Sequence, residues 1–173
     1  MHCVDNQVGE IFFLDAPGGT GKTFLIRLLL AIRSKNYIAL ALASSGIAAT
    51  LSPSGRTAHS ALKLPLNIQP IETPRCNISK SSGMGKELQQ CKLIAWDECT
   101  MAHKKSLEAV KRSLQDFQGN SKPFGSTLIL FAGDFRQTLP IIPRSTRADE
   151  MNACLKNCYL WAHVKILKLT VNE

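Results

Sequence analysis

Aromatic residues and long apolar runs are scarce in this sequence of 173 residues. Phe, Trp and Tyr together make up 6% of the chain, so base stacking is not expected to dominate any contact with a nucleic acid. No apolar run approaches the roughly 18 residues of a membrane-spanning helix, so no membrane partner is expected. The opening segment MHCVDNQVGE lacks the basic start and apolar centre of a secretory signal, which predicts an intracellular protein.

Metal-binding cysteine patterns are also missing. The six cysteines form no CxxC pair and no cluster with histidine at zinc-site spacing. Cys154 and Cys158 could share one face of a helix, but the sequence places no further ligands near them. We interpret the cysteines as reduced thiols, as is typical of a reducing compartment.

Positive charge and apolar residues, by contrast, are plentiful. Lys and Arg number 21 against 13 Asp and Glu, which gives a net charge of +8 that is spread along the chain. Such a charge favours polyanionic partners, because Lys and Arg release condensed counterions from phosphates; the alternative is simply a basic, soluble surface. With 45% hydrophobic residues, the chain is expected to form one domain over residues 1–173.

The apolar residues are arranged as an α/β fold. Continuous apolar segments predict strands at 11–15, 37–43, 93–97, 127–134 and 164–170. Strands that are apolar on both faces are typical of a mostly parallel sheet covered by helices, so we expect a three-layer α/β/α domain.

The segments between these strands complete the expected fold. Helices are predicted at 22–35, at 103–117 and around 149–158. The first is apolar nearly all round, which predicts burial on several sides. The second carries one apolar stripe, and the Pro- and Ser-rich segment 66–84 is interpreted as a long surface loop.

A glycine-rich turn, APGGTGKT, separates the first strand from the first helix. Strand, turn and helix in this order are the context of a phosphate-binding loop, in which backbone N–H groups surround a β-phosphate. Lys22 would reach the β- and γ-phosphates, and the Thr23 hydroxyl would bind Mg²⁺. Ala16 replaces the first glycine of the pattern, but Pro17 favours extended geometry there. The predicted ATP-binding residues are Pro17, Gly18, Gly19, Thr20, Gly21, Lys22 and Thr23.

Two other predicted strands end in polar residues that suit the same site. Asp97 and Glu98 follow LIAW; Asp97 would hold Mg²⁺, and Glu98 would orient and deprotonate the attacking water. Gln137, in GDFRQ, could sense a γ-phosphate, and Asp134 and Arg136 would face the ligand beside it. The carboxyl ends of parallel strands meet at one edge of a sheet, which would bring these residues together.

Four segments, in this order, resemble the petite-integration-frequency DNA helicases, superfamily 1 motors that move 5' to 3' on single-stranded DNA. They are IFFLDAPGGTGKT, ASSGIAATLSPSGRTAHS, LIAWDECTM and GDFRQTLPII, and the resemblance runs from about Gly9 to Asn172. It implies a RecA-like P-loop NTPase fold and an ATP-dependent DNA helicase with ATP and Mg²⁺ as cofactors. It further implies a nuclear location and a link to DNA repair, recombination and telomere maintenance.

The same resemblance implies a track for single-stranded DNA. Ser44, Ser45 and Gly46 lie at the end of the second strand and the start of a short helix, where hydroxyl and N–H groups could bind phosphates. Thr57 and His59, in GRTAHS, match family positions that line the same groove. These five residues are the predicted DNA-binding residues.

Family motors also have a second RecA-like domain, whose arginine reaches the γ-phosphate. The sequence ends where an Arg-bearing motif would begin, so we expect the first motor domain only, with little activity alone, and a second motor domain as a partner. The alternative is a truncated or transposon-derived remnant that binds ATP or DNA without unwinding. A small-molecule P-loop kinase is disfavoured, because no acceptor-binding lid is present and GDFRQ and GRTAHS would have no role.

Overall fold

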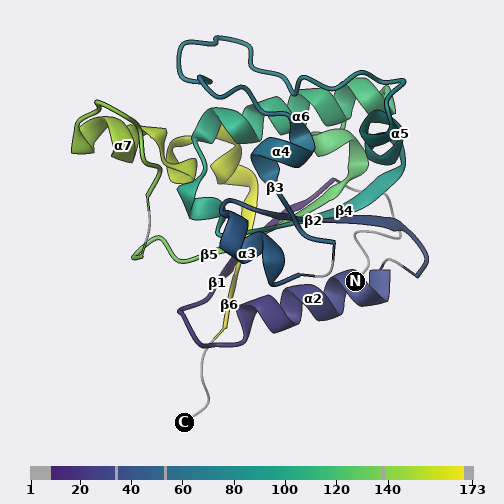
Figure 1. Ribbon diagram of the computed structural model, residues 1–173, viewed down its shortest axis with the longest axis horizontal. Helices are drawn as coiled ribbons and strands as arrows, with labels where there is room; N and C mark the ends of the chain where they lie inside the picture. The colour runs from purple at the N-terminus through teal and green to yellow at the C-terminus, as the bar shows by residue number, and fades with distance from the viewer. Residues whose placement is uncertain (1–8, 34, 53, 138, 170–173) are drawn as a thin grey trace.

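A single parallel sheet organises the computed structural model, which describes residues 9–33, 35–52, 54–137 and 139–169. The described strands follow the order β3-β2-β4-β5-β1-β6, and every neighbouring pair is parallel (Figure 1). Their bounds are β1 Ile11–Asp15, β2 Ile38–Ala43, β3 Arg56–Thr57, β4 Cys91–Asp97, β5 Leu128–Gly133 and β6 Val164–Lys168. The predicted α/β fold with a mostly parallel sheet is confirmed.

Helices lie on both faces of the sheet. One face carries α2 (Lys22–Arg33), and the other carries α4 (Ala58–Leu62), α5 (Gly83–Gln90) and α6 (Lys104–Gln118) (Figure 1). Two short helices, α3 (Gly46–Thr50) and α7 (Arg147–Ala153), follow strand ends or loops. Four short 3-10 helices are also described: Cys99–Met101, Pro123–Ser126, Leu155–Asn157 and Tyr159–His163.

The core lies mainly between the sheet and α6. Ile94 and Trp96 of β4 are buried there against Leu107 and Leu114, which belong to the apolar stripe predicted for this helix. Gly119 ends α6 in the left-handed region, with φ 64°, where a glycine carries no Cβ penalty. A smaller cluster fills the space between the sheet and α2.

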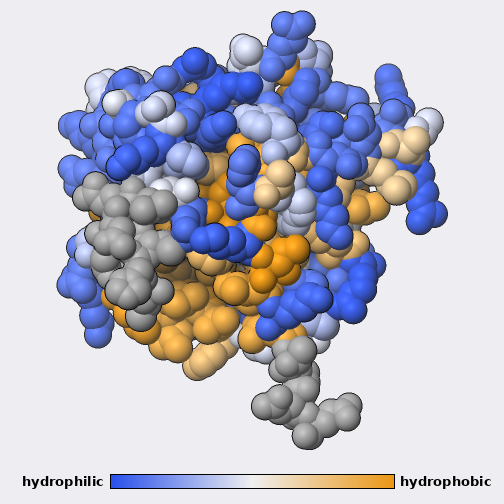
Figure 2. Space-filling view, turned by 180° about the vertical axis from the view of Figure 1, so that it is seen from behind, coloured by the Kyte–Doolittle hydropathy of each residue, from blue (hydrophilic) through white to orange (hydrophobic). Residues whose placement is uncertain are grey.

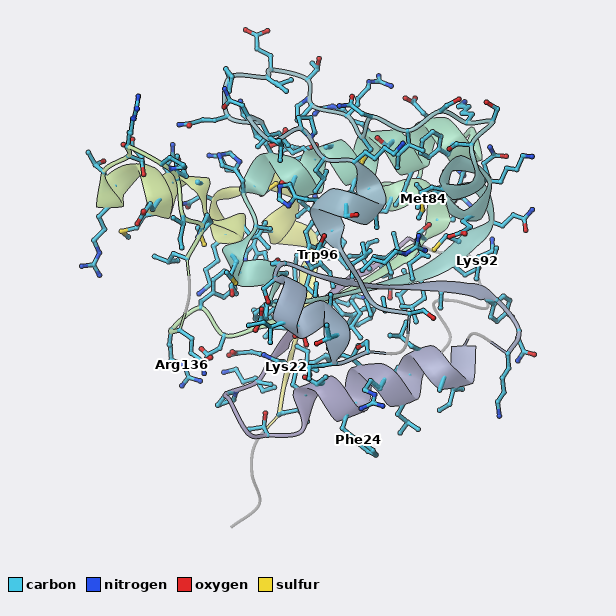
Figure 3. All side chains as sticks on the ribbon, in the orientation of Figure 1. Lys22, Phe24, Met84, Lys92, Trp96 and Arg136 are labelled. Atoms are coloured by element: carbon cyan, nitrogen blue, oxygen red, sulfur yellow. The ribbon has the colours of Figure 1, made fainter. Side chains whose placement is uncertain are left out.

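The prediction that the first helix is buried on several sides is wrong. Phe24, Leu28 and Ile32 are 72%, 46% and 41% exposed, at a spacing that puts them on one face of α2, whereas Ile26 is only 2% exposed. Phe24 points away from the sheet (Figure 3). The reason is that no second layer of described residues covers α2, so its outer face meets solvent. The helix also ends at Arg33, earlier than predicted.

The exposed side chains of α2 are part of an apolar patch on one face of the molecule. It gathers over the lower part of the space-filling view, where α2 runs in Figure 1 (Figure 2). The edge strand β6 adds to the exposed apolar residues, because Ile166 and Leu167 are 54% and 46% exposed.

The last two residues of the predicted loop 66–84 begin α5, and the segment 66–82 is more than the surface loop that its composition predicts. Ile68 and Cys76 are buried, and hydrogen bonds with α6 hold the chain at Gln69, Ile71 and Cys76. The Lys105 Nζ donates to the carbonyls of Gln69 and Ile71, at 2.5 and 2.8 Å, and the Ser113 Oγ accepts from the Cys76 N–H at 2.9 Å. These anchors lie far away in sequence, so the composition of the segment gives no sign of them.

The cysteines at 76, 91, 99, 154 and 158 are buried and form no disulfides. Burial raises the pKa of Cys76 to about 11 and that of Cys91 to about 12, so these thiols stay protonated at neutral pH. The described residues contain no cluster of His, Cys, Asp and Glu suited to a metal ion. Cys3 and the rest of residues 1–8, where a secretory signal was not expected, lie outside the described residues.

No helix in the described part of the chain combines the length and apolar character required to cross a bilayer.

The two faces of α2 should respond differently to truncation. We expect Ile26→Ala to lower the free energy of unfolding by about 2–5 kcal/mol, because it opens a cavity against the sheet. Phe24→Ala, on the solvent face of the same helix, should change it by less than about 1 kcal/mol. Urea denaturation of both variants checks this. Equal losses would contradict the exposed face.

Candidate functional site

The glycine-rich turn forms a loop between β1 and α2. Gly19 and Gly21 have φ values of 83° and 79°, in the left-handed region that glycine adopts without penalty. The Thr20 Oγ1 donates to the Pro17 carbonyl at 2.7 Å and closes the turn. Ala16, which replaces the first glycine of the pattern, is fully buried, and its N–H donates to the Gly133 carbonyl at 3.4 Å. The methyl group therefore packs without disturbing the loop.

The loop opens onto a hollow of about 320 Å³. Most of the predicted nucleotide-site residues line it, including residues from the ends of three different strands. They are Pro17, Gly18, Gly19, Gly21, Lys22, Thr23, Asp97, Glu98 and Gln137. Thr20 is not among the lining residues, and its hydroxyl is hydrogen-bonded within the loop.

Asp97 is the centre of this site. Its carboxylate is buried, accepts from the Thr23 hydroxyl at 3.3 Å and lies 3.9 Å from the Lys22 Nζ. The Glu98 N–H donates to the same carboxylate at 2.9 Å. The Thr23 hydroxyl and the Asp97 carboxylate thus present neighbouring oxygen atoms, the ligand type that Mg²⁺ prefers, and they could hold that ion.

Glu98 links this centre to the predicted DNA track. Its backbone is in the left-handed region, with φ 52° and ψ 35°, a conformation that costs a non-glycine residue about 1–3 kcal/mol. Its side chain accepts a hydrogen bond of 2.7 Å from the Ser45 hydroxyl. Ser45 also caps α3, because its Oγ accepts from the Ala48 N–H at 3.2 Å. Ser45 and Glu98 are 53 residues apart, and no local sequence signal indicates their contact.

The segment after β5 places Gln137 beside the glycine loop. A Cβ added to Gly18 would lie 3.3 Å from the Gln137 Nε2, so the amide is packed closely against the loop. Asp134 does not face a ligand as expected, because it is buried and paired with Arg136. The Arg136 Nε and one terminal nitrogen donate to the two Asp134 oxygens at 2.9 and 3.1 Å, which lowers the pKa of Asp134.

Lys22 and Arg136 lie at the same end of the sheet (Figure 3). The two hydrogen bonds to Asp134 hold the Arg136 guanidinium against the segment that follows β5. The spacing of aspartate and arginine two residues apart, directly after a strand, is the sequence signal that could have indicated this pair.

The predicted DNA-binding residues fall into two groups. Ser44 and Ser45 adjoin the nucleotide site: the Ser44 Oγ accepts from the Trp96 indole N–H at 3.0 Å, and its N–H donates to the Asp97 carbonyl at 3.1 Å. Gly46 is exposed at the start of α3. Thr57 and His59 belong to the β3–α4 segment, where the Thr57 hydroxyl caps α4 by accepting from the Ser60 N–H. His59 is exposed and lines a different hollow.

The glycine loop, the acidic end of β4 and the amide after β5, at one edge of an all-parallel sheet, define a RecA-like P-loop nucleotide-binding domain. Within this class, residues 1–173 match the family model described as PIF1-like helicase, and the chain belongs to the PIF1-like helicase family.

Curated helicases are similar along most of the chain. The chain is 30% identical over 165 residues to the ATP-dependent DNA helicase Pif1 of Psychrobacter sp., covering 95% of this chain and 25% of that protein. It is 30% identical over 146 residues to the ATP-dependent DNA helicase PIF1 of Danio rerio, covering 82% and 22%. The chain thus spans about a quarter of the length of these relatives.

Solved structures share the fold. The Pif1 helicase from Bacteroides in complex with ADP-AlF3 and single-stranded DNA has a TM-score of 0.80 at 24% identity, covering 100% of this chain and 41% of that one. The Pif1 helicase from Candida albicans has a TM-score of 0.78 at 23% identity, covering 98% and 38%.

Nucleotide binding should depend on Lys22. We expect Lys22→Ala to weaken Mg-ATP binding at least about tenfold, or about 1.4 kcal/mol, because Lys22 places its ammonium at the mouth of the loop. Lys86→Ala, on the exposed surface of α5, is the matched control and should bind as the parent does. Calorimetric titration measures both. Equal affinity of the Lys22 variant and the parent would remove the phosphate-loop assignment.

Proposed function

We propose that residues 1–173 form the first RecA-like motor domain of an ATP-dependent 5'-to-3' DNA helicase, which binds Mg-ATP and single-stranded DNA. The observation that carries this proposal is the hydrogen bond between the Ser45 hydroxyl and the Glu98 carboxylate, at 2.7 Å. It joins a residue of the proposed DNA track to the proposed hydrolytic residue. The names of the relatives, ATP-dependent DNA helicases, support the same function.

The nucleotide would bind in the hollow at the glycine loop. The loop N–H groups would surround the β-phosphate, and Lys22 would contact the β- and γ-phosphates. The Thr23 hydroxyl and the Asp97 carboxylate would hold Mg²⁺, whose charge would offset that of the phosphates when it is bound. Gln137, which packs against Gly18, would contact the γ-phosphate.

DNA binding would control Glu98 through Ser45. A hydroxyl has a single hydrogen, so Ser45 cannot donate to Glu98 and to a DNA phosphate at the same time. While Ser45 donates to it, the Glu98 carboxylate is held toward α3 and one of its oxygens is occupied. A phosphate that takes the Ser45 hydrogen bond would free Glu98 to orient and deprotonate water. Hydrolysis would therefore be fastest when DNA occupies the track.

An arginine must also meet the charge that develops on the transferred phosphoryl group. Two nitrogens of Arg136 are hydrogen-bonded to Asp134, which holds this guanidinium beside its own strand end. We propose that a second motor domain supplies the arginine. Absence of such an arginine typically lowers the rate by about 10³–10⁵-fold.

The net charge of +8 supports a polyanionic partner. A nuclear location and roles in DNA repair, recombination and telomere maintenance stay predictions from the resemblance.

Removing the Ser45 hydroxyl should uncouple hydrolysis from DNA. We expect Ser45→Ala to raise single-turnover ATP hydrolysis without DNA about fivefold, the equivalent of one hydrogen bond, and to reduce the stimulation by single-stranded DNA. Thr50→Ala, on the same short helix α3, keeps the Ser45–Glu98 contact and should behave as the parent. If Ser45→Ala retains the parent's rates with and without DNA, Ser45 does not control Glu98.

The polypeptide of residues 1–173, assayed alone, should bind ATP but turn it over near background and unwind no duplex. The physical reason is that the arginine that we assign to a second motor domain is not part of this polypeptide. Steady-state ATPase assays with and without single-stranded DNA measure this. DNA-stimulated turnover of about 1 s⁻¹ or faster, abolished by Glu98→Gln, would show that the polypeptide completes its own site.

A further inference from the structure

A second hollow, of about 410 Å³, lies outside the nucleotide site. Its lining comes from α4, the start of segment 66–82, the beginning of α6 and the segment 140–143. It shares no lining residue with the hollow at the glycine loop within the described part of the chain. His59, which the sequence places on the DNA track, is exposed and lines it. The hollow therefore adjoins the proposed path of the single strand.

Ser106 lies in the lining of this hollow with an unused hydroxyl. The side chain is 1% exposed, and its Oγ is the one buried side-chain polar atom in the described residues that has no hydrogen-bond partner. Buried polar groups are nearly always hydrogen-bonded, because an unpaired one costs free energy. A ligand that bonds to the Ser106 hydroxyl would remove that cost.

His103 supplies a second polar group. Its Nδ1 accepts from the Lys105 N–H at 3.1 Å, so the other ring nitrogen, Nε2, carries the hydrogen and is left to donate to a ligand. Burial, together with the charges of Lys105 and Lys104, lowers the pKa of His103 and favours this neutral form. Lys105 also fixes the adjoining wall, because its Nζ holds the carbonyls of Gln69 and Ile71.

The remaining walls are mostly apolar. Leu66 and Ile141 are 94% and 81% exposed and flank the opening, and Ile68 and Pro140 lie deeper, where they are buried. Apolar side chains with a few polar groups, in a hollow of roughly 300–1,000 Å³, are typical of sites for small molecules. No Asp or Glu is among the described lining residues, so no fixed negative charge in the lining opposes an approaching phosphodiester.

We propose that this hollow receives one unpaired nucleobase of the bound single strand, with its ring between the apolar walls and its edge hydrogen-bonded to Ser106 and His103. This inference rests on the proposed function, because it gives the DNA track a site that contacts a base as well as phosphates. With few aromatic residues in the chain, a pocket with polar groups replaces an aromatic stacking platform.

A scan with abasic DNA tests the site. Binding of a labelled oligo-dT is measured by fluorescence anisotropy, and a single abasic residue is then moved along the strand. We expect one position at which the abasic residue weakens binding about three- to tenfold, as loss of a hydrogen-bonded base would. Ser106→Ala should weaken binding of the intact strand about threefold and have no further effect on the strand abasic at that position.

Ser113→Ala is the matched control on the same helix. Ser113 is also buried, but its Oγ accepts from the Cys76 N–H, so its removal should lower the melting temperature and leave DNA affinity unchanged. Ser106→Ala should leave the melting temperature unchanged or raised, because it removes an unpaired hydroxyl. A loss of stability as large as that of Ser113→Ala would overturn the proposal.

The outcomes separate the base site from the function on which it depends. The base site alone is overturned if the intact strand binds in a salt-sensitive way but abasic residues are tolerated equally at every position. It is also overturned if the Ser106→Ala variant binds the intact strand as the parent does. No binding of the intact strand at low salt overturns the proposed function, and the base site with it.

Discussion

The charge of Asp97 is the constraint on which the rest of the site depends. A buried carboxylate is stable only when cations and donors surround it, and here Lys22, the Thr23 hydroxyl and the Glu98 N–H fill that role. These contacts tie the start of α2 to the end of β4. Through Glu98 and Ser45 they extend to the start of α3. The glycine loop, the acidic pair and the proposed DNA track are thus one connected set of polar contacts.

The order of the strands places this network. Across the sheet the strands follow the order β2-β4-β5-β1. The strand that carries Asp97, β4, therefore lies between β2, which leads to Ser45, and β5, which leads to Gln137. Because all pairs are parallel, the three connections leave from the same edge of the sheet. Residues that are far apart in sequence meet there without any long loop having to reach across the molecule.

Much of this arrangement could be predicted from the sequence. Continuous apolar runs marked the strands closely, and β1 has the predicted bounds. The glycine loop and Asp97 could be identified because their chemistry requires particular residue types at fixed spacing. Their roles in binding and catalysis stay predictions.

Features that depend on contacts between distant segments could not be predicted. A helix that is apolar all round does not reveal which side a second layer leaves uncovered, so the exposure of Phe24 was missed. The anchoring of segment 66–82 and the Ser45–Glu98 bond depend on partners 36 and 53 residues away. The helix α5 was missed because its short sequence, GMGKELQQ, has two glycines and only two large apolar residues.

The exposed edge strand β6 bears on how copies of this protein behave in solution. An edge strand with exposed apolar side chains, such as Ile166 and Leu167, can template pairing with a strand of another molecule. Lys165 and Lys168 stand on either side of these residues. Lys165 is paired with Glu10 at 2.6 Å, so the charge of Lys168 is the one that repels a second copy approaching in the same way. Salt screens this repulsion as it screens attraction to polyanions. Conditions that release a nucleic acid from the basic surface would therefore also favour self-association through β6.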